Sequence, residues 1–141
     1  MAKRSTAAQE TYHPGSQAVK KVTFADMTVD QLVDRFAEIG IAQYPAVMGG
    51  ATREFKRLFD QMNAVDLELR ARGQDARLAL LRLYDHPNIQ VRLEAAKWTL
   101  GIAPEAARKV IQTISDSKRY PQAGDAGMAL WTLDEGIFKP D

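Results

Sequence analysis

The chain has 141 residues, of which 45% are apolar and 26% charged, values typical of one globular domain. It contains no cysteine, which excludes disulfides, thiolate metal sites and a thiol nucleophile. A formal net charge of +1 argues against a general affinity for nucleic acid or anionic membranes. No apolar run is long enough to cross a bilayer or to serve as a secretory signal, so we expect a cytoplasmic protein without membrane association.

The N-terminal residues 1–26 are polar and lack apolar periodicity, which predicts a mobile extension ahead of one domain spanning 27–141. The segment Thr28–Gln31 has the form of a capping box, in which two side chains satisfy backbone NH groups at a helix start. Apolar residues then recur at helical spacing, and we expect Gly40 to end this first helix. A short second piece is predicted to continue to Met48.

The remainder of the chain also shows helix signals. Gly73 follows a long amphipathic segment, as glycine often does at a helix end. Asn88 is placed to cap a helix after an Asp-His-Pro turn, and Pro104 suits a first helical position, where its missing NH would be unpaired anyway. No stretch alternates with a period of two, so the sequence predicts an all-α fold of about six helices. The segments expected after residue 48 are 51–72, 75–84, 88–100, 104–115 and a last helix that ends near 135.

Two Trp-Thr-Leu triplets, at 98–100 and 131–133, lie 33 positions apart and begin with the chain's only tryptophans. Each follows a helix and a proline-containing turn, so the spacing is that of one helix pair and predicts a short α-α superhelix. We expect both tryptophans in the core, because they fall on apolar helix stripes. Residues 79–101, ALLRLYDHPNIQVRLEAAKWTLG, resemble a HEAT repeat, and 104–133 resemble it more weakly because the Val-Arg pair is missing.

The stretch from about residue 27 to residue 140 also resembles a family of small bacterial proteins, catalogued as domain of unknown function number two thousand and nineteen. The resemblance implies a compact all-α domain with HEAT-like repeats, and it brings no established activity. The features that carry it are RLFDQMNAVDLELRARG, the turn and helix DHPNIQVRLEAAKWTL, APEAARKVI and the closing QAGDAGMALWTLDEGIFKP.

Few residues are suited to catalysis or metal binding. His13 lies in the polar extension and His86 in the predicted turn, 73 positions away and without a neighbouring carboxylate pattern, so they predict no metal site. Asp30 and Asp34 share a helix face opposite the apolar stripe, with no nucleophile and base beside them. Gly49-Gly50 lacks the lysine and the preceding strand of a phosphate-binding loop. We therefore expect no enzymatic activity, no cofactor and no metal.

The charge is distributed unevenly along the chain. From Arg70 to Arg119 there are ten basic and five acidic residues, a difference of +5. At the end of this stretch the loop 117–121 combines two cations, an aromatic ring and a proline, and loops carry function more often than packed helices do. An ordinary solvated surface is the competing interpretation. The candidate partner-binding residues are Arg92, Lys97, Arg108, Lys109, Lys118, Arg119 and Tyr120.

The helix after the Asp-His-Pro turn carries several of the candidate surface positions. Gln90, Glu94 and Lys97 are expected to face away from the core. Arg92 is expected to pair with Asp85, which would tie the turn to the helix. This face would therefore be open to a partner.

These patterns lead to two functional hypotheses. The first is a protein-binding module, in one version an immunity or antitoxin-like partner that occupies an effector. The alternative is a nucleic-acid binder that uses the basic segment 70–119, and binding of that kind falls steeply with salt. A monomer and a homodimer both remain open, because short solenoids expose apolar end faces.

Overall fold

The computed structural model describes residues 23–141, and all regular structure in this part of the chain is helical. It confirms the predicted all-α fold with six α-helices. No helix among these residues is long and apolar enough to cross a membrane. Residues 1–22 of the predicted extension lie outside the described residues. The elements, with η for a 3₁₀ helix, are η1 (Phe24–Asp26), α1 (Val29–Met48), α2 (Thr52–Arg72), α3 (Gln74–Leu78), η2 (Ala79–Asp85), α4 (Ile89–Trp98), α5 (Pro104–Asp116) and α6 (Gln122–Asp134).

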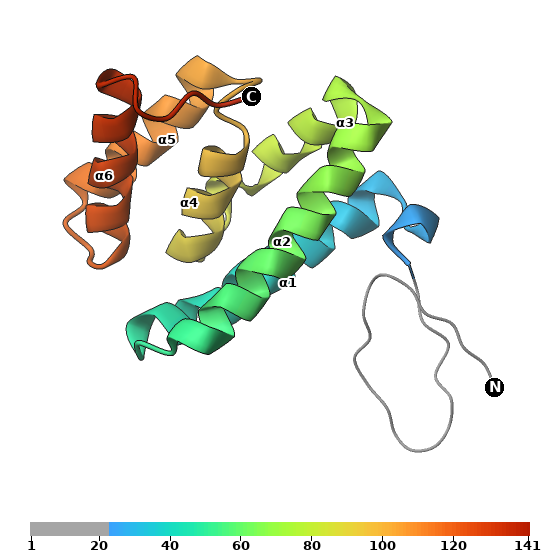
Figure 1. Ribbon diagram of the computed structural model, residues 1–141, viewed down its shortest axis with the longest axis horizontal. Coiled ribbons are helices and arrows are strands. Elements are labelled where there is room, and N and C mark those ends of the chain that lie inside the picture. The colour runs from blue at the N-terminus through green and yellow to red at the C-terminus, as the bar shows by residue number, and fades with distance from the viewer. Residues whose placement is uncertain (1–22) are drawn as a thin grey trace.

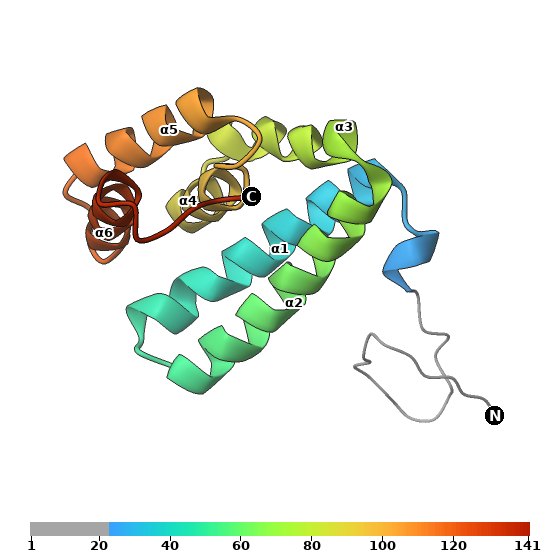
Figure 2. The same ribbon diagram turned by 45° about the horizontal axis from the view of Figure 1, so that its top comes forward.

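The helices form two antiparallel pairs joined by a central helix (Figures 1 and 2). α1 and α2 make the first, long pair, and α5 and α6 make the second. α3 and η2 carry the chain from the end of α2 to the start of α4. α4 packs against η2, α1, α5 and α6, so it is the element through which the two pairs are connected.

α1 is one continuous helix, so the prediction that Gly40 ends it is wrong. Its start is as predicted, because Thr28 Oγ1 accepts from Gln31 N at 3.1 Å and Gln31 Oε1 accepts from Thr28 N at 2.8 Å. Gly40 is buried against α4, and a Cβ at this position would lie 2.8 Å from Val91 Cγ2. The glycine therefore permits close approach of two helices instead of ending one.

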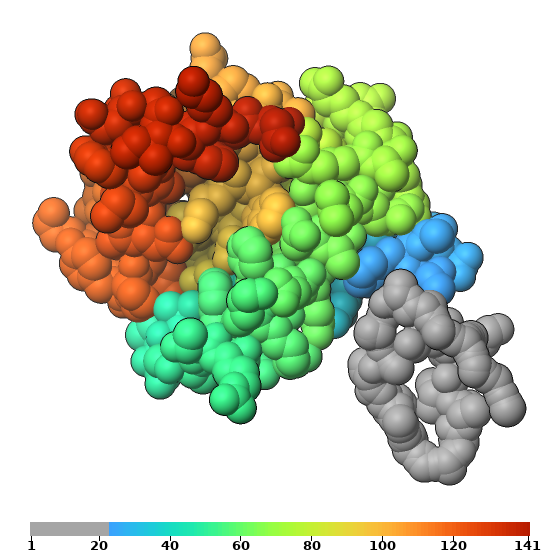
Figure 3. Space-filling view, in the orientation of Figure 1, coloured from blue at the N-terminus to red at the C-terminus, as the bar shows by residue number. Residues whose placement is uncertain are grey.

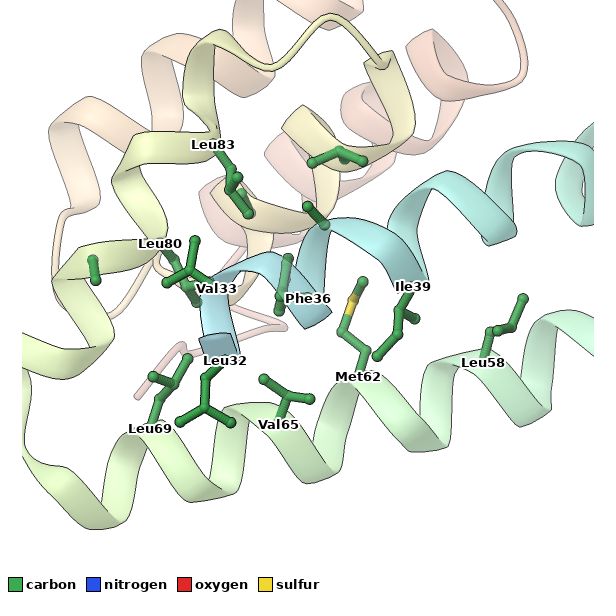
Figure 4. Packing of buried hydrophobic residues seen from close by; sticks show 14 of the residues in the cluster. Leu32, Val33, Phe36, Ile39, Leu58, Met62, Val65, Leu69, Leu80 and Leu83 are labelled. Atoms are coloured by element: carbon green, nitrogen blue, oxygen red, sulfur yellow. The ribbon is translucent and has the colours of Figure 1, made fainter. Parts of the chain in front are cut away.

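Two clusters of buried apolar side chains hold the helices together. The first lies between α1, α2 and the α3–η2 segment and includes Phe36 and Met62 (Figure 4). The second lies between α4, α5 and α6 and includes Leu93 and Ile111. α4 contributes to both clusters, since Val91 belongs to the first and Leu93 to the second. Opposite faces of this short helix are therefore both covered.

The prediction that Gln90 and Glu94 face away from the core is wrong, since their exposed fractions are 2% and 3%. Gln90 Nε2 donates to Gln43 Oε1 at 3.4 Å and to Glu94 Oε2 at 3.2 Å. Gln122 Nε2 donates to Gln90 Oε1 at 3.0 Å. These contacts join α1, α4 and α6. α1 and α6 therefore cover the face of α4 that carries Gln90 and Glu94. Buried amides need such partners, because an unpaired one costs about 1–3 kcal/mol.

The two tryptophans have different environments. Trp98 on α4 is partly buried, and its ring centroid lies 5.5 Å from that of Phe59 on α2. Trp131 on α6 is 53% exposed, so its predicted place in the core is wrong. The physical reason is position in the stack: α4 has neighbours on both sides, whereas α6 is the last helix and no later helix within residues 23–141 covers its outer face.

After α6, residues 136–141 run back towards α3 (Figure 1). Arg77 Nη1 donates to the main-chain oxygen of Asp141 at 3.0 Å, and Arg70 Nη2 lies 3.1 Å from Asp141 Oδ1. The segment passes so close to Gly101 that a Cβ there would lie 2.3 Å from the carbonyl carbon of Asp141. It thereby links the α5–α6 pair to the end of α2 and to α3.

Candidate basic binding surface

Most basic side chains between Arg70 and Arg119 are engaged within the fold. Five of the ten form ion pairs, and Arg77 is buried, with its guanidinium donating to main-chain oxygens. The ion pairs and their N–O distances are Arg70–Asp66 (2.6 Å), Arg72–Glu68 (3.0 Å), Arg82–Asp30 (2.5 Å), Lys97–Asp125 (3.0 Å) and Arg108–Asp134 (2.9 Å).

Four cations remain, and in the part of the chain that the structure describes none of them has an ion-pair partner. They lie on the first turn of α4, on α5 and in the α5–α6 loop, which meet at one end of the molecule (Figure 1). Lys97 and Arg108, also predicted as site residues, are held apart from this group by their carboxylate partners. We call the four cations and the neighbouring exposed tyrosine the basic surface: Arg92, Lys109, Lys118, Arg119 and Tyr120.

An open pocket of about 250 Å³ lies between the end of η2, the start of α4 and the last turns of α5. Arg92 and Lys109 line it, and the buried Ile89 and Ile114 give it an apolar base. The remaining lining residues are Tyr84, Val110, Thr113 and Ser117. The pocket thus combines aliphatic and aromatic walls with two cations.

Arg92 is half-buried at the edge of this pocket, where its Nη1 donates to the main-chain oxygen of His86 at 2.7 Å. Asp85 is exposed, and the expected ion pair between Asp85 and Arg92 does not form. Burial lowers the pKa of Arg92, and the positive charge of Arg119 lowers it further. The guanidinium stays charged at neutral pH, so two like charges lie near each other at this edge.

The Ser117 side chain bridges main-chain groups at the start of the α5–α6 loop. Ser117 Oγ donates to the main-chain oxygen of Ile114 at 2.6 Å and accepts from Arg119 N at 3.2 Å. Lys118 has a φ of 59°, in the left-handed region that non-glycine residues rarely adopt. Tyr120 is 62% exposed. The loop therefore presents two cations and an aromatic ring beside a turn that hydrogen bonds stabilise.

A second charged group, made of Glu94, Lys97 and Asp125, lies between α4 and α6. Burial raises the pKa of Glu94, and the ammonium of Lys97 opposes this shift. Burial also disfavours the charge on Lys97, but the carboxylates of Glu94 and Asp125 raise its pKa overall. The charge of Lys97 is therefore paired within the fold, unlike the charges of the four unpaired cations.

Of the histidine and aspartate candidates, His86 and Asp30 occupy structural positions. His86 Nδ1 accepts from Asn88 N at 3.0 Å, which braces the turn before α4, and Asp30 pairs with Arg82. His13 lies outside the described residues. Among residues 23–141, no three or more histidine, aspartate or glutamate side chains are placed to hold a metal ion.

Sequence reasoning identified the cations but missed the pocket. Its walls come from Tyr84 and Ile89 on one side and from Val110, Thr113 and Ser117 on the other. The aliphatic members follow helical spacing and are therefore indistinguishable in sequence from ordinary core positions. The packing of α5 across the start of α4 leaves Val110 partly exposed above the buried Ile89 and Ile114.

A family model described as "Domain of unknown function (DUF2019)" matches residues 30–134. Among solved structures, the crystal structure of the protein RPA1889 from Rhodopseudomonas palustris CGA009 is similar, with 48% sequence identity and a TM-score of 0.80. The similarity covers 86% of this chain and 100% of that chain. No curated protein matches. The family match contains every residue of the basic surface.

Proposed function

We propose that this chain, which belongs to the family of the domain of unknown function DUF2019, is a non-enzymatic protein-binding module. Its partner presents an acidic surface to Arg92, Lys109, Lys118 and Arg119. The observation that carries this proposal is a contrast among the basic residues of the segment 70–119. Five of its ten basic residues form ion pairs and Arg77 is buried, while the other four have no ion-pair partner among the described residues; two of them line a pocket and two lie in the neighbouring α5–α6 loop.

The unpaired cations favour a binding role on electrostatic grounds. Burial lowers the pKa of Arg92, and the positive charge of Arg119 lowers it further, so the two cations repel each other in the free protein. A partner carboxylate placed between them would remove this repulsion and add charge-assisted hydrogen bonds. Complementary charge also steers association and suppresses wrong partners.

One version of this function is an immunity or antitoxin-like role, in which the domain occupies an effector protein. A small helical domain whose functional groups lie on its surface suits such a role. We also propose that the η2–α4 and α5–α6 segments are HEAT-like repeats, on the strength of the Asp-x-Pro turn and the recurring Trp-Thr-Leu triplet. The proposed location is cytoplasmic, and the proposed oligomeric state is a monomer or a homodimer.

Nucleic-acid binding is the second candidate, and the exposed Tyr120 ring beside Lys118 and Arg119 favours it. Such pairs of cations and aromatics bind single strands by stacking and charge. The engagement of six basic residues elsewhere in 70–119 argues against it, because a duplex or strand needs a row of free cations along its backbone. Protein binding is therefore the conclusion.

The test is affinity capture from lysate with the tagged wild-type protein and two charge-reversed variants. Lys109→Glu combined with Arg119→Glu alters the basic surface. Arg53→Glu combined with Lys139→Glu is the matched control, since both residues are exposed and neither forms an ion pair among the described residues. We expect a stoichiometric protein that survives nuclease treatment and is lost only with the first variant. Recovery of nucleic acid that disappears at high salt would contradict the proposal.

A further inference from the structure

We infer that the pocket beside Arg92 and Lys109 anchors one apolar side chain of an acidic segment in the partner protein, with the flanking carboxylates against the basic surface. This inference rests on the proposed function and adds the chemistry of the partner.

The size and base of the pocket indicate a side chain as its occupant. At about 250 Å³ it falls below the range of about 300–1,000 Å³ that is usual for small-molecule and cofactor sites. Ile89 and Ile114 are buried beneath it, and Val110 and Tyr84 are partly exposed within it. An aliphatic or aromatic side chain that covers these atoms removes apolar surface from water on both partners.

The hydroxyl groups in the pocket do not require a polar ligand. Thr113 Oγ1 donates to the main-chain oxygen of Lys109 at 3.0 Å, and Ser117 Oγ donates to that of Ile114 at 2.6 Å. Both donors are therefore satisfied by main-chain oxygens of α5, and the Tyr84 hydroxyl is hydrogen-bonded to Thr99 Oγ1. A bound segment would make its polar contacts with the cations instead. Arg92 and Lys109 lie at the pocket, and the other two cations lie beyond it in the α5–α6 loop.

Two other occupants fit these observations less well. A nucleic-acid backbone offers no apolar group for the pocket base. A second copy has the same formal net charge of +1 and is no acidic partner as a whole, and six of the carboxylates on its α1 and α2 are held in ion pairs within their own chain. These are Asp30, Glu38, Glu54, Asp60, Asp66 and Glu68.

The first experiment measures binding of two blocked synthetic peptides to the full chain by NMR titration. One peptide has a single leucine among glutamates, and the other is all glutamate and equally long. Because a buried leucine contributes substantially to affinity, we expect the leucine peptide to bind about tenfold more tightly. Addition of the leucine peptide should shift the protein's backbone amide resonances most at Ile89, Val110 and Ser117. Equal affinity of the two peptides would overturn the inference.

A matched pair of variants tests the pocket itself. Thr113→Trp places a large ring over the pocket from an exposed position that lines it, and Gln112→Trp places the same ring one residue away, outside the lining. Thr113→Trp should abolish the tenfold advantage of the leucine peptide and leave the weaker binding of the all-glutamate peptide unchanged. Gln112→Trp should preserve the advantage. Unchanged leucine selectivity in Thr113→Trp would also overturn the inference.

The remaining outcomes separate this inference from the proposed function. If Lys109→Glu/Arg119→Glu abolishes binding of both peptides but the wild type shows no preference for leucine, the proposal of an acidic partner stands and the inference of an apolar anchor is refuted. Tighter binding of a single-stranded oligonucleotide than of either peptide would refute both. Self-association in light scattering that is abolished by Thr113→Trp would assign the pocket to a second copy and refute the inference.

Discussion

Arg108 Nη2 lies 2.9 Å from Asp134 Oδ1, an ion pair that joins α5 to the end of α6. Lys109 is the next residue in the chain, and within the described residues no carboxylate pairs with it. Adjacent cations on one helix thus face different surroundings. Arg108 serves the fold, while Lys109 lines the pocket and adds to an unbalanced positive surface.

This difference predicts opposite effects of two alanine substitutions. Arg108→Ala should lower the free energy of unfolding by up to about 1 kcal/mol, as expected for an exposed ion pair, and leave partner binding unchanged. Lys109→Ala should change stability by less than about 0.5 kcal/mol and weaken binding. Urea unfolding and titration with the captured partner measure both quantities. Binding loss in Arg108→Ala equal to that in Lys109→Ala would contradict the division of roles.

The close contact between α1 and α4 predicts a cost for Gly40→Ala. The new Cβ would lie 2.8 Å from Val91 Cγ2 and 3.2 Å from Val91 Cα, so the helices must separate. We expect a net loss of about 1–2 kcal/mol in unfolding free energy, after the better helix propensity of alanine is included. Gly127→Ala is the control, because its nearest neighbour is the Ser115 hydroxyl at 3.4 Å. That variant should gain about 0.5–1 kcal/mol, and equal effects at the two glycines would contradict the packing argument.

The buried Glu94 predicts a pH-dependent difference between the wild type and Glu94→Gln. Burial raises the pKa of Glu94 in the folded state above the usual value of 4.5. Folding therefore favours the protonated form of Glu94. The stability that this form contributes is fully present below pH 4.5 and is lost as pH rises through the pKa of the folded state. Glu94→Gln should be more favourable relative to wild type at about pH 7 than at about pH 4. Parallel unfolding titrations test this, and a difference independent of pH would refute it.

The passage of residues 136–141 over Gly101 predicts that Gly101→Ala releases this segment. A Cβ placed 2.3 Å from the carbonyl carbon of Asp141 leaves no room for the tail in its present course. Amide hydrogen exchange should accelerate at Ile137 and Phe138, whose NH groups donate to the Thr132 main-chain oxygen. Asp141→Asn should have a smaller effect, because the main-chain contact with Arg77 remains. Unchanged exchange in Gly101→Ala would contradict the close contact.

Local signals in the sequence were sufficient for the helix starts. Thr28 and Asn88 accept hydrogen bonds from the NH groups of the first turns of α1 and α4, and Pro104 begins α5, because capping depends on residues within one turn. Gly73 likewise ends α2, where its φ of 108° suits glycine. The starts of α1, α4 and α5 and the end of α2 therefore followed from short-range chemistry.

Features set by the packing of distant segments were not predictable in this way. Gly40 has the sequence context of a helix end, and only the proximity of Val91 shows its role in packing. Glu94 was expected at the surface and Trp131 in the core, and the exposure of both is the opposite. Glu94 is buried because α4 has helices on several sides, whereas Trp131 is exposed because α6 lies at the edge of the packed helices. The pocket depends on how α5 crosses the start of α4. The cations of the basic surface were identified from composition, whereas their lack of partners required the fold.

The most direct test of the central claim is calorimetric titration of the captured partner against Lys109→Glu/Arg119→Glu and its control Arg53→Glu/Lys139→Glu. We predict that the first variant loses affinity at least about tenfold, since it turns attraction into repulsion at the contact, and that the control binds like the wild type. Equal affinity of the two variants would show that the partner binds elsewhere and would contradict the account.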